Sequence, residues 1–375
     1  MTDVTPTTTP TSHLEAWAAL LVDYSVEVRP GQTVAITGGV AAEPLLRAIY
    51  RLVVARGAHP VMLPTFSGLG ADLLLGGSDE QIGRVGPTER FLRQEADATI
   101  TVLADTNTKA MSAVDPARQA LYGKARTELM AAFMGRAAAG SLRWVLTLYP
   151  TDAYAQDADM ATDAFADFVR RAGKFDQPDP VAAWREQEAA NARLIGWLGG
   201  KREVRLRGRD TDLTLAVEGR TWSNSHGRRN FPDGEIFTGP IEDSVNGHVR
   251  FSYPAVTAGR EVSDVRLRFH GGRVVDATAA KNEEYLIRML DTDAGARTLG
   301  EFAFGTNFGI ERFTKNILFD EKIGGTVHMA IGAGAPDTGS VNRSAVHWDL
   351  ICDLRDGGGV DVDGEPFLRD GRFVV

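Results

Sequence analysis

Two histidines and a carboxylate lie on two neighbouring stretches of apolar sequence near the end of this 375-residue chain. His328 lies in the run 326–331 (TVHMAI), and His347 and Asp349 lie in the run 344–351 (SAVHWDLI). Both runs are rich in residues typical of strands. Side chains two positions apart on a strand point to the same face, so His347 and Asp349 can bind one cation together. The pattern predicts a metal site with His328 as a third ligand.

Each of these residues has a simpler interpretation when it is taken alone, because a single histidine on a strand is more often a hydrogen-bonded core residue than a ligand. A carboxylate between apolar neighbours needs a partner, however, and this favours the metal site. Trp348, between the two predicted ligands, should face away from the metal and belong to the core. Asp353 is predicted to point outward or to form a turn.

Two earlier segments each add a glutamate. Glu235 lies in a loop dense in turn residues, 230–240, and Glu301 ends the segment 293–301 beside an apolar run. Imidazole and carboxylate ligands suit Zn, Co, Mn or Fe(II) better than Mg or Ca. Five ligands exceed the need of one catalytic ion with an open position. They indicate two ions that share a bridging carboxylate, an arrangement that makes hydroxide at neutral pH and polarises a carbonyl.

The size and composition of the chain limit what can hold these residues. Its length favours two domains, and 43% hydrophobic with 24% charged residues is typical of a globular protein. A net charge of -9 without a basic run argues against a nucleic-acid or membrane partner. Cys352 is the one cysteine, so no disulfide forms within the chain and a reducing compartment is expected. With no apolar run long enough to span a membrane and no start typical of a signal peptide, we expect a cytoplasmic protein.

The first half of the chain alternates strands and helices. Residues 1–12 are predicted to be a loose tail, and residues 13–199 an α/β, Rossmann-like, three-layer scaffold domain with a parallel sheet. Its strands are predicted at 33–37, 60–64, 98–103 and 143–148. The glycines at 38–39 and 67–70 follow strands but match neither a dinucleotide fingerprint nor a phosphate loop, so we interpret them as turn residues.

Gly199 and Gly200 mark a change of pattern and the predicted domain boundary. Residues 200–375 are predicted to form an α+β, strand-rich, barrel-like domain that carries the metal site and catalysis. Two alternating runs flank the glycines at 271–272 and predict a hairpin. Helices are predicted at 283–290 and around 294–299.

Four segments of this half resemble those of a known family, the thermophilic-type metalloaminopeptidases, which include aminopeptidases T and S. The segments are 230–240, 293–301, 318–328 and 344–353, and the motif VRPGQ at 28–32 also resembles the family's N-terminal domain. The resemblance therefore covers nearly the whole chain. It implies an α/β domain joined to a β-rich domain, a homodimer, and a dinuclear metal site in an enclosed cavity. The implied activity is hydrolysis of N-terminal residues from peptide substrates.

The resemblance also implies roles for individual residues. Glu301 is expected to bridge the two ions, which are zinc, cobalt or manganese, and Glu235 either binds one ion or acts as the base. These two glutamates are the predicted catalytic residues. Glu321 is a sixth candidate ligand, and its alternative is a solvated turn carboxylate paired with Lys322. The ligand set implied for the two ions is Glu235, Glu301, His328, His347 and Asp349.

One departure from the family lies just after the strand of His328. The family has a tyrosine before a proline there, and the tyrosine is thought to donate a hydrogen bond at the metal site; this sequence has Ala335 in the run 331–336 (IGAGAP). Losing a donor that stabilises an oxyanion costs on the order of 10²-fold in rate. Either another donor replaces it, Tyr285 being chemically suitable, or turnover is slow or directed at another substrate, down to a lapsed homologue that only binds.

A second function uses fewer of these residues. Two histidines and one carboxylate also form the iron site of non-haem Fe(II) oxygenases, and the ring-cleaving dihydroxypyridine dioxygenases resemble the same fold. In that case His328, His347 and Asp349 would hold one iron, and Glu235 and Glu301 would have no role. The presence of both glutamates favours the peptidase. Metal content near two ions per chain, and not one, is the expected distinction.

Overall fold

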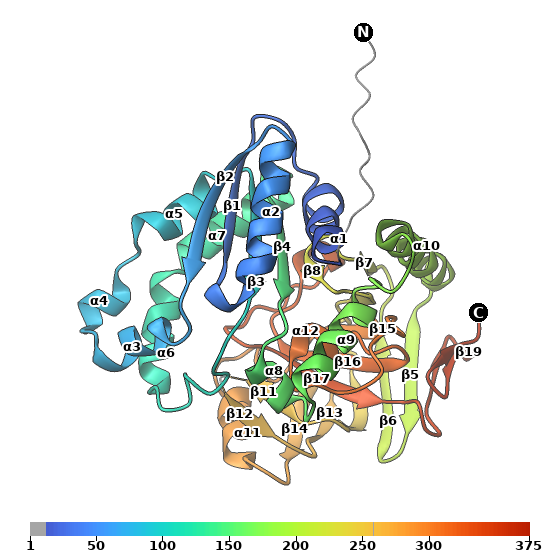
Figure 1. Cartoon of the computed structure of the whole chain (residues 1–375). Helices are drawn as coiled ribbons and strands as arrows, with labels where there is room; N and C mark the ends of the chain where they lie inside the picture. The colour runs from blue at the N-terminus through green and yellow to red at the C-terminus, as the bar shows by residue number, and fades with distance from the viewer. Residues whose placement is uncertain (1–12, 258) are drawn as a thin grey trace. The chain divides into compact units, whose positions relative to one another are not determined.

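The computed structural model describes residues 13–257 and 259–375 and divides into two compact units (Figure 1). The loose tail predicted for residues 1–12 lies outside the described residues. The described part of the first unit comprises residues 13–153, 174–183 and 228–231, and the second unit comprises Tyr154–Gly173, Trp184–Gly227 and Pro232–Val375.

The first unit contains a five-stranded parallel sheet with the order β2-β1-β3-β4-β8. All four strands that the sequence predicted for this half are present. The strands are β1 (Thr33–Gly39), β2 (His59–Thr65), β3 (Ala98–Leu103), β4 (Arg143–Leu148) and β8 (Asn230–Phe231). The helices assigned to this part of the chain are α1 (His13–Ala19), the π-helix Leu20–Ser25, the 3₁₀ turn Val40–Ala42, α2 (Glu43–Ala55), α3 (Leu69–Gly76), α4 (Asp79–Gly83), α5 (Pro87–Gln94), α6 (Pro116–Ala125), α7 (Thr127–Ala138) and α8 (Asp152–Asp157).

The glycines at the end of β1 allow its neighbour to approach closely. A Cβ on Gly38 would lie 2.9 Å from the carbonyl oxygen of Val102, and one on Gly39 would lie 2.7 Å from that of Ala104. Both distances are too short for any side chain. This supports the interpretation of these glycines as structural residues.

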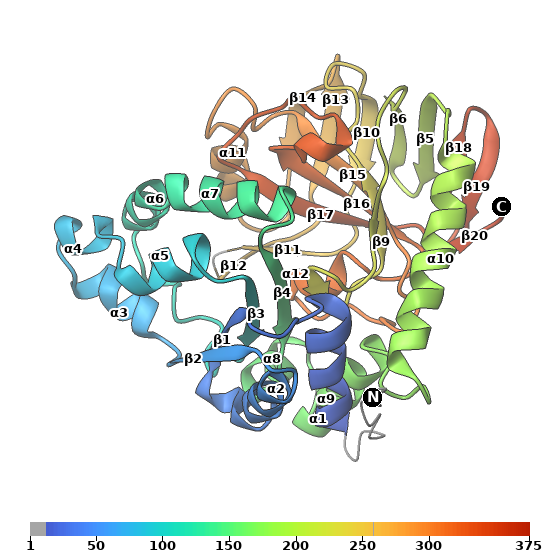
Figure 2. The same ribbon diagram turned by 90° about the horizontal axis from the view of Figure 1, so that it is seen from above.

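The second unit is built on two antiparallel sheets whose side chains share one hydrophobic core. The hairpin predicted across 271–272 is present as β13 and β14. The larger sheet has the order β14-β13-β10-β6-β5-β18-β19-β20 and the smaller has the order β17-β16-β15-β9-β7, so the strands form two sheets in place of one barrel-like sheet. Figure 2 shows β15, β16 and β17 side by side.

The strands of the larger sheet are β5 (Glu203–Gly208), β6 (Thr211–Ala216), β10 (Asn246–Arg250), β13 (Arg266–His270), β14 (Arg273–Thr278), β18 (Gly359–Val362), β19 (Glu365–Arg369) and β20 (Arg372–Phe373). Those of the smaller sheet are β7 (Ser223–Ser225), β9 (Glu235–Thr238), β15 (Leu299–Gly305), β16 (Thr326–Gly332) and β17 (His347–Asp353). The remaining elements are the pair β11 (Ala255–Thr257) and β12 (Arg260–Val262), helices α9 (Thr162–Ala172), α10 (Pro180–Leu198), α11 (Glu283–Leu290) and α12 (Ile317–Asp320), and the 3₁₀ turn Pro336–Thr338.

This division of the chain differs from the predicted boundary at Gly199 and Gly200. Helix α9 lies in the second unit, where the ring of Phe168 packs 5.4 Å from that of Phe319 and the amide of Asn307 donates to the carbonyl of Ala172 at 3.0 Å. A helical pattern in a sequence can show which face is apolar, but not the partner against which that face packs.

The predicted helix around 294–299 is wrong, because residues 294–297 form turns and β15 begins at Leu299. The carboxylate of Asp293 accepts the backbone N–H of Gly295 at 3.0 Å, and a Cβ on Gly295 would lie 2.2 Å from the carbonyl oxygen of Arg343. The segment therefore follows a tight turn held by its own side chain.

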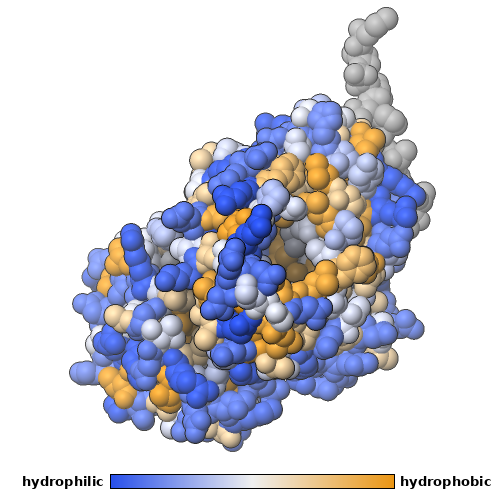
Figure 3. All heavy atoms as spheres, turned by 90° about the vertical axis from the view of Figure 1, so that its left-hand side faces the viewer, coloured by the Kyte–Doolittle hydropathy of each residue, from blue (hydrophilic) through white to orange (hydrophobic). Residues whose placement is uncertain are grey.

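None of the described helices combines the length and apolar character required to cross a membrane. On the face of the molecule in Figure 3, hydrophobic residues lie interspersed with hydrophilic ones.

Candidate metal centre

One face of the smaller sheet carries the predicted ligands, and the other face packs into the core. The register pairs Glu301 with Ala330 and Ala330 with Asp349, so these three side chains form one row across β15, β16 and β17. His328 lies two residues from Ala330 and His347 two residues from Asp349, on the same face. Small residues at the paired positions, including Ala303 opposite His328, leave room for the long polar side chains.

The opposite face is apolar throughout β15, β16 and β17. Its side chains are buried in the core of the second unit, and they include Phe302, Phe304, Val327, Met329, Ile331, Trp348 and Leu350. Trp348 therefore faces away from the site, as predicted. The ring of Tyr285 meets that of Trp348 edge-on at 6.0 Å. Tyr285 lies on this core side, so its proposal as a replacement for the tyrosine donor is wrong.

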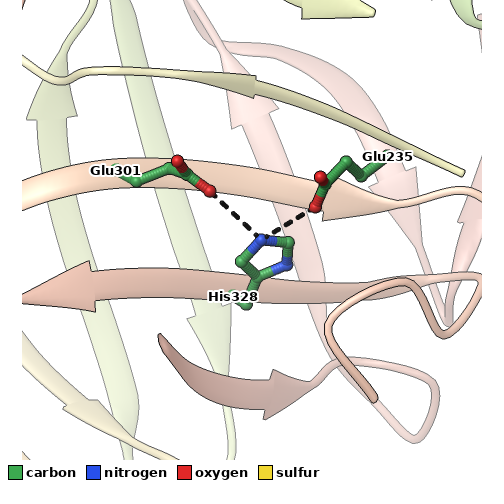
Figure 4. Close-up of side chains that lie close together, drawn as sticks. All are labelled: Glu235, Glu301 and His328. Atoms are coloured by element: carbon green, nitrogen blue, oxygen red, sulfur yellow. Dashed lines mark ion pairs between the residues drawn. The ribbon is translucent and has the colours of Figure 1, made fainter. Parts of the chain in front are cut away.

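The buried end of the site is centred on His328, whose side chain is 0% exposed. Its Nε2 atom lies 3.1 Å from Oε2 of Glu235 and 3.4 Å from Oε1 of Glu301 (Figure 4). Neither ring nitrogen of His328, nor Oε2 of Glu235, has a hydrogen-bond partner among the described residues. Buried polar atoms are almost always partnered, so these atoms indicate a site shaped for a cation.

The other end of the site is open, because the side chain of His347 is 45% exposed. Its Nδ1 atom lies 2.8 Å from the carbonyl oxygen of Ala333, to which it donates. That bond leaves Nε2 unprotonated and free to bind a cation. Nε2 lies 3.6 Å from Oδ1 of Asp349, which has no hydrogen-bond partner among the described residues.

The six predicted ligands form three overlapping groups in which the ligand atoms lie within 4.8 Å of one another. We call Glu235, Glu321 and His328 the inner group, and Glu301, His347 and Asp349 the outer group. The outer group is itself one of the three clusters, and Glu301 and Asp349 each also join a cluster around His328. The structure thus brings together side chains from four segments spread over more than a hundred positions.

Sequence reasoning missed two buried charges beside the inner group. The Nζ atom of Lys322 is 0% exposed, is hydrogen-bonded to Oε1 of Glu321 and lies 3.9 Å from Oε1 of Glu235. Glu321 is therefore paired with Lys322, as in its alternative interpretation, but its side chain is only 13% exposed and is not solvated. Asp233 is also buried: one carboxylate oxygen accepts the N–H of Gly227 at 2.9 Å, and the other has no partner among the described residues. The one signal in the sequence was a lysine between the apolar runs at 317–319 and 326–331.

The proximity of these groups shifts their proton affinities in opposite directions. Burial raises the pKa of Glu321 to about 8 and that of Asp233 to about 7, and burial also raises the pKa of Glu301. Burial opposes ionisation of Glu235 as well, but Lys322 and His328 together lower its pKa to about 2. The carboxylates cannot all be ionised in the absence of further positive charge.

The two basic groups respond to the same carboxylates. Burial alone would lower the pKa of His328, but Glu235 and Glu301 raise it well above its usual value. Burial alone would also lower the pKa of Lys322. The carboxylates of Glu235, Glu321 and Asp233 outweigh this effect of burial and raise the pKa above its usual value. Lys322 is therefore a permanent internal cation.

The loop between β16 and β17, which contains Ala335, is held by two carboxylates. Glu242 accepts hydrogen bonds from Oγ of Ser340 at 3.2 Å and from the N–H of Val341 at 2.7 Å. Asp293 accepts the N–H of Ala345 at 2.7 Å. These bonds fix the loop that leads into His347.

Comparison with known proteins gives a consistent result. Residues 11–373 match the family described as thermophilic metalloprotease (M29). The chain is 30% identical to Aminopeptidase 2 of Geobacillus stearothermophilus, over 96% of this chain and 97% of that protein, and 33% identical to Aminopeptidase T of Thermus thermophilus, over 55% and 58%.

Two solved structures are similar to this one over nearly their whole length. The structure of AmpT from Thermus thermophilus matches with a TM-score of 0.84 and 25% identity, covering 97% of this chain and 99% of that one. The structure of 2,5-dihydroxypyridine dioxygenase from Pseudomonas putida KT2440 matches with a TM-score of 0.52 and 15% identity, covering 98% and 99%, which establishes a shared fold alone. The chain belongs to the thermophilic metalloprotease family, as the resemblance of its motifs predicted.

Proposed function

We propose that this chain is a metal-dependent aminopeptidase, which hydrolyses the bond after the first residue of a peptide at the site in its second unit. Membership of the metalloprotease family and the similarity to Aminopeptidase 2 support this activity. The observation that carries the proposal is the convergence of six ligand-type side chains at one sheet face, with ring nitrogens and carboxylate oxygens that have no hydrogen-bond partner among the described residues.

The charge of the site favours two divalent ions. The site contains five carboxylates, Asp233, Glu235, Glu301, Glu321 and Asp349, and one lysine, Lys322. With every carboxylate ionised and both histidines neutral, five negative charges and one positive charge leave a net charge of four negative charges. Two divalent cations would balance it, and buried charge is tolerated only when it is balanced. Nitrogen and oxygen ligands suit zinc, cobalt or manganese.

The side chains divide the work between holding the ions and moving a proton. Two divalent ions bound here would polarise the scissile carbonyl and lower the pKa of a water molecule. Glu301 belongs to two of the three clusters and is proposed as the bridging ligand. Glu235, with a pKa of about 2, stays ionised and is assigned as a ligand. Glu321, which is hydrogen-bonded to Lys322 at the buried end of the site, is proposed to carry the proton from water to the leaving amine.

The peptide is proposed to reach the site from the side of His347, the exposed residue of the six. The surplus of carboxylates attracts the α-ammonium group at the substrate's first residue. We also propose that the protein is a cytoplasmic homodimer. The single cysteine suits a reducing compartment, and the mass measured in solution tests the dimer.

The test is hydrolysis of a panel of aminoacyl-anilides by the full chain, freed of metal and reloaded with zinc, cobalt or manganese, with metal content measured in parallel. We expect metal-dependent release of the anilide, close to two ions per chain, and no detectable turnover in Glu301→Gln. Equal activity in Glu301→Gln, or no hydrolysis with any of these metals, would refute the proposal.

A mononuclear Fe(II) ring-cleaving dioxygenase is the second candidate, because His328, His347 and Asp349 share one face of a fold that is similar to that of the dioxygenase. It gives no role to Glu235 and Glu301, although both lie within 3.4 Å of His328. It predicts one iron per chain and oxygen uptake with a dihydroxypyridine. A chain that binds metal without either reaction would be the lapsed homologue that Ala335 suggested.

A further inference from the structure

Lys322 is the one lysine with a fully buried amine beside the site, and the family-derived ligand set gives it no role. Among the described residues, its ammonium group forms ion pairs with carboxylates of the inner group: it is hydrogen-bonded to Glu321 and lies 3.9 Å from Glu235. The charge of the buried Asp233 also acts on it. The ion pairs of the outer residues are with each other and with His328, and none involves Lys322 among the described residues. A cation is therefore fixed at one end of the site.

The backbone of Lys322 is held in place by α12 and by the segment that follows the strand of Glu301. Its N–H donates to the carbonyl of Phe319 at 3.0 Å, and its own carbonyl accepts the N–H of Asn307 at 3.1 Å. The side-chain amide of Asn307 donates to the carbonyl of Asp233 at 2.8 Å. A Cβ on Gly305 would lie 2.1 Å from the carbonyl of Ile323, so glycine is required for this approach. The position of the ammonium group is thus built into the fold.

We propose that Lys322 is a positioning residue, a fixed internal cation that holds the carboxylates of Glu235 and Glu321 around His328 and so controls metal binding by the inner group alone. This inference rests on the proposed two-ion function. Without the lysine, the carboxylates of Glu235 and Glu321 would lose their shared ion-pair partner, repel one another and turn away from His328. Groups that orient ligands in this way change metal affinity by about 10 to 100-fold.

A purely electrostatic role predicts the opposite sign. Removing a positive charge makes the site more negative, so divalent ions would bind more tightly. A purely structural role predicts that both ions are weakened together, because the whole sheet face would be disturbed. The affinities of the two ions, measured separately, therefore distinguish the three roles.

The experiment is a stepwise Co²⁺ titration of the metal-free full chain, followed by its visible absorption and by competition with a chelator. In Lys322→Met we expect one equivalent to bind within a few-fold of its wild-type affinity and the other to bind about 10 to 100-fold more weakly. Lys322→Arg, which keeps the charge, should recover much of the second affinity. Lys315→Met is the matched control, since Lys315 pairs with Asp159 and is partly exposed, and it should behave as wild type.

Loss of a buried cation can prevent folding because it leaves carboxylates unpaired. The double variant Glu321→Gln/Lys322→Gln removes both members of the pair, with Glu321→Gln as its reference, and remains usable if Lys322→Met does not fold. Since Lys322 acts through Glu321 and Glu235, adding Lys322→Gln to Glu321→Gln should weaken the second affinity by less than the roughly 10 to 100-fold that orienting groups usually contribute.

Several results would overturn the inference. They are unchanged or tighter binding of both ions in Lys322→Met, equal weakening of both, or independent effects in the double variant. A wild-type chain that binds two ions and hydrolyses anilides while its Lys322 variants bind both ions normally refutes the lysine's role only. A wild-type chain with one ion or no hydrolysis refutes the proposed function itself.

Discussion

The molecule contains two five-stranded sheets that use their buried positions differently. In the parallel sheet the buried residues of β1 and β3 are almost all apolar, including Val34, Ile36, Ile100 and Val102. The antiparallel sheet β17-β16-β15-β9-β7 buries apolar side chains on one face, and Glu235, Glu301 and His328 on the other. Burying ionisable groups costs free energy unless they are paired or bind a metal.

This difference indicates that the parallel sheet mainly stabilises the fold. The buried ionisable side chains of the antiparallel sheet serve the reaction and lower the stability of the metal-free chain. Substitutions in the two sheets should therefore have opposite consequences. A change in the first should alter unfolding and spare the reaction. A change in the second should abolish the reaction and spare, or even improve, the metal-free fold.

The largest effect is expected from Glu301→Gln. Loss of the proposed bridging carboxylate should lower kcat/KM by more than about 10³-fold, since groups that only orient ligands already account for about 10 to 100-fold. Burial and the charges of Asp349 and Glu235 raise the pKa of Glu301, so removing its charge relieves repulsion. The melting temperature in chelator should not fall.

Steady-state kinetics and thermal unfolding of the same preparation test the predicted loss of kcat/KM and the predicted melting temperature of Glu301→Gln. Glu284→Gln, on the exposed face of α11, is the matched control and should change neither quantity. A large drop in the melting temperature of the metal-free Glu301→Gln chain would show that this carboxylate holds the fold together, and the contrast between the sheets would fail.

The counterpart in the parallel sheet is Ile100→Ala. Ile100 is fully buried in β3, between β1 and β4. The cavity should cost about 2 to 5 kcal/mol of unfolding free energy, while kcat/KM and metal content of the folded protein stay at wild-type values. Urea unfolding of the metal-free chain measures the free energy of unfolding. The control is Thr101→Ala, at a half-buried position of the same strand, which should lower the free energy of unfolding by less. A fall of tenfold or more in kcat/KM for Ile100→Ala would mean that this sheet also supports the chemistry.

The two sheets were not equally predictable from the sequence. The strands of the parallel sheet are short, largely apolar runs, and all four that the pattern predicted are present. The short strand β8 comes from residues 230–231 and could not be assigned, because it pairs with β4 far away in the sequence.

At the site, strand alternation accounts for only part of the predicted convergence. His347 and Asp349 follow directly from strand alternation, whereas the addition of Glu235 and Glu301 rested on chemical type and on family resemblance. The alternative interpretation of Glu321 paired it with Lys322 as a solvated turn carboxylate, because a Glu-Lys pair in a turn is usually exposed. Its burial depends on Asn307 and Gly305, whose contacts with that turn are tertiary.

A substitution at Ala335, in the loop beside the exposed end of the metal site, is expected to increase activity. If the family's tyrosine donates a hydrogen bond at the metal site, Ala335→Tyr should raise kcat by about 10 to 100-fold. Glu242 accepts hydrogen bonds from Ser340 and Val341 in the loop that contains Ala335, so the substitution should not change the backbone conformation of this loop. Ala335→Phe supplies the same ring without the hydroxyl. Equal kcat values for the Tyr and Phe variants would mean that no donor is missing at this position.

The smallest expected effect is a gradual dependence of metal affinity on pH, which concerns only the site on the antiparallel sheet. In the metal-free chain, burial holds the pKa of Glu321 at about 8 and that of Asp233 at about 7, and the pKa of His328 lies well above its usual value. Ions bind only deprotonated ligands. Below these pKa values protons occupy the site and compete with the metal, so the metal affinity should rise as pH increases from 6 to 8.

The rise should be up to about tenfold per pH unit for each proton displaced, because one pKa unit corresponds to a tenfold change in the equilibrium. Calorimetric titration with Zn²⁺ in buffers of different ionisation enthalpy counts the protons released. Glu321→Gln should release about one proton fewer at pH 7, because its amide has none to lose. An affinity that is constant between pH 6 and 8 would mean that the carboxylates are already ionised without metal, and that this sheet stores no charge repulsion for the ions to relieve.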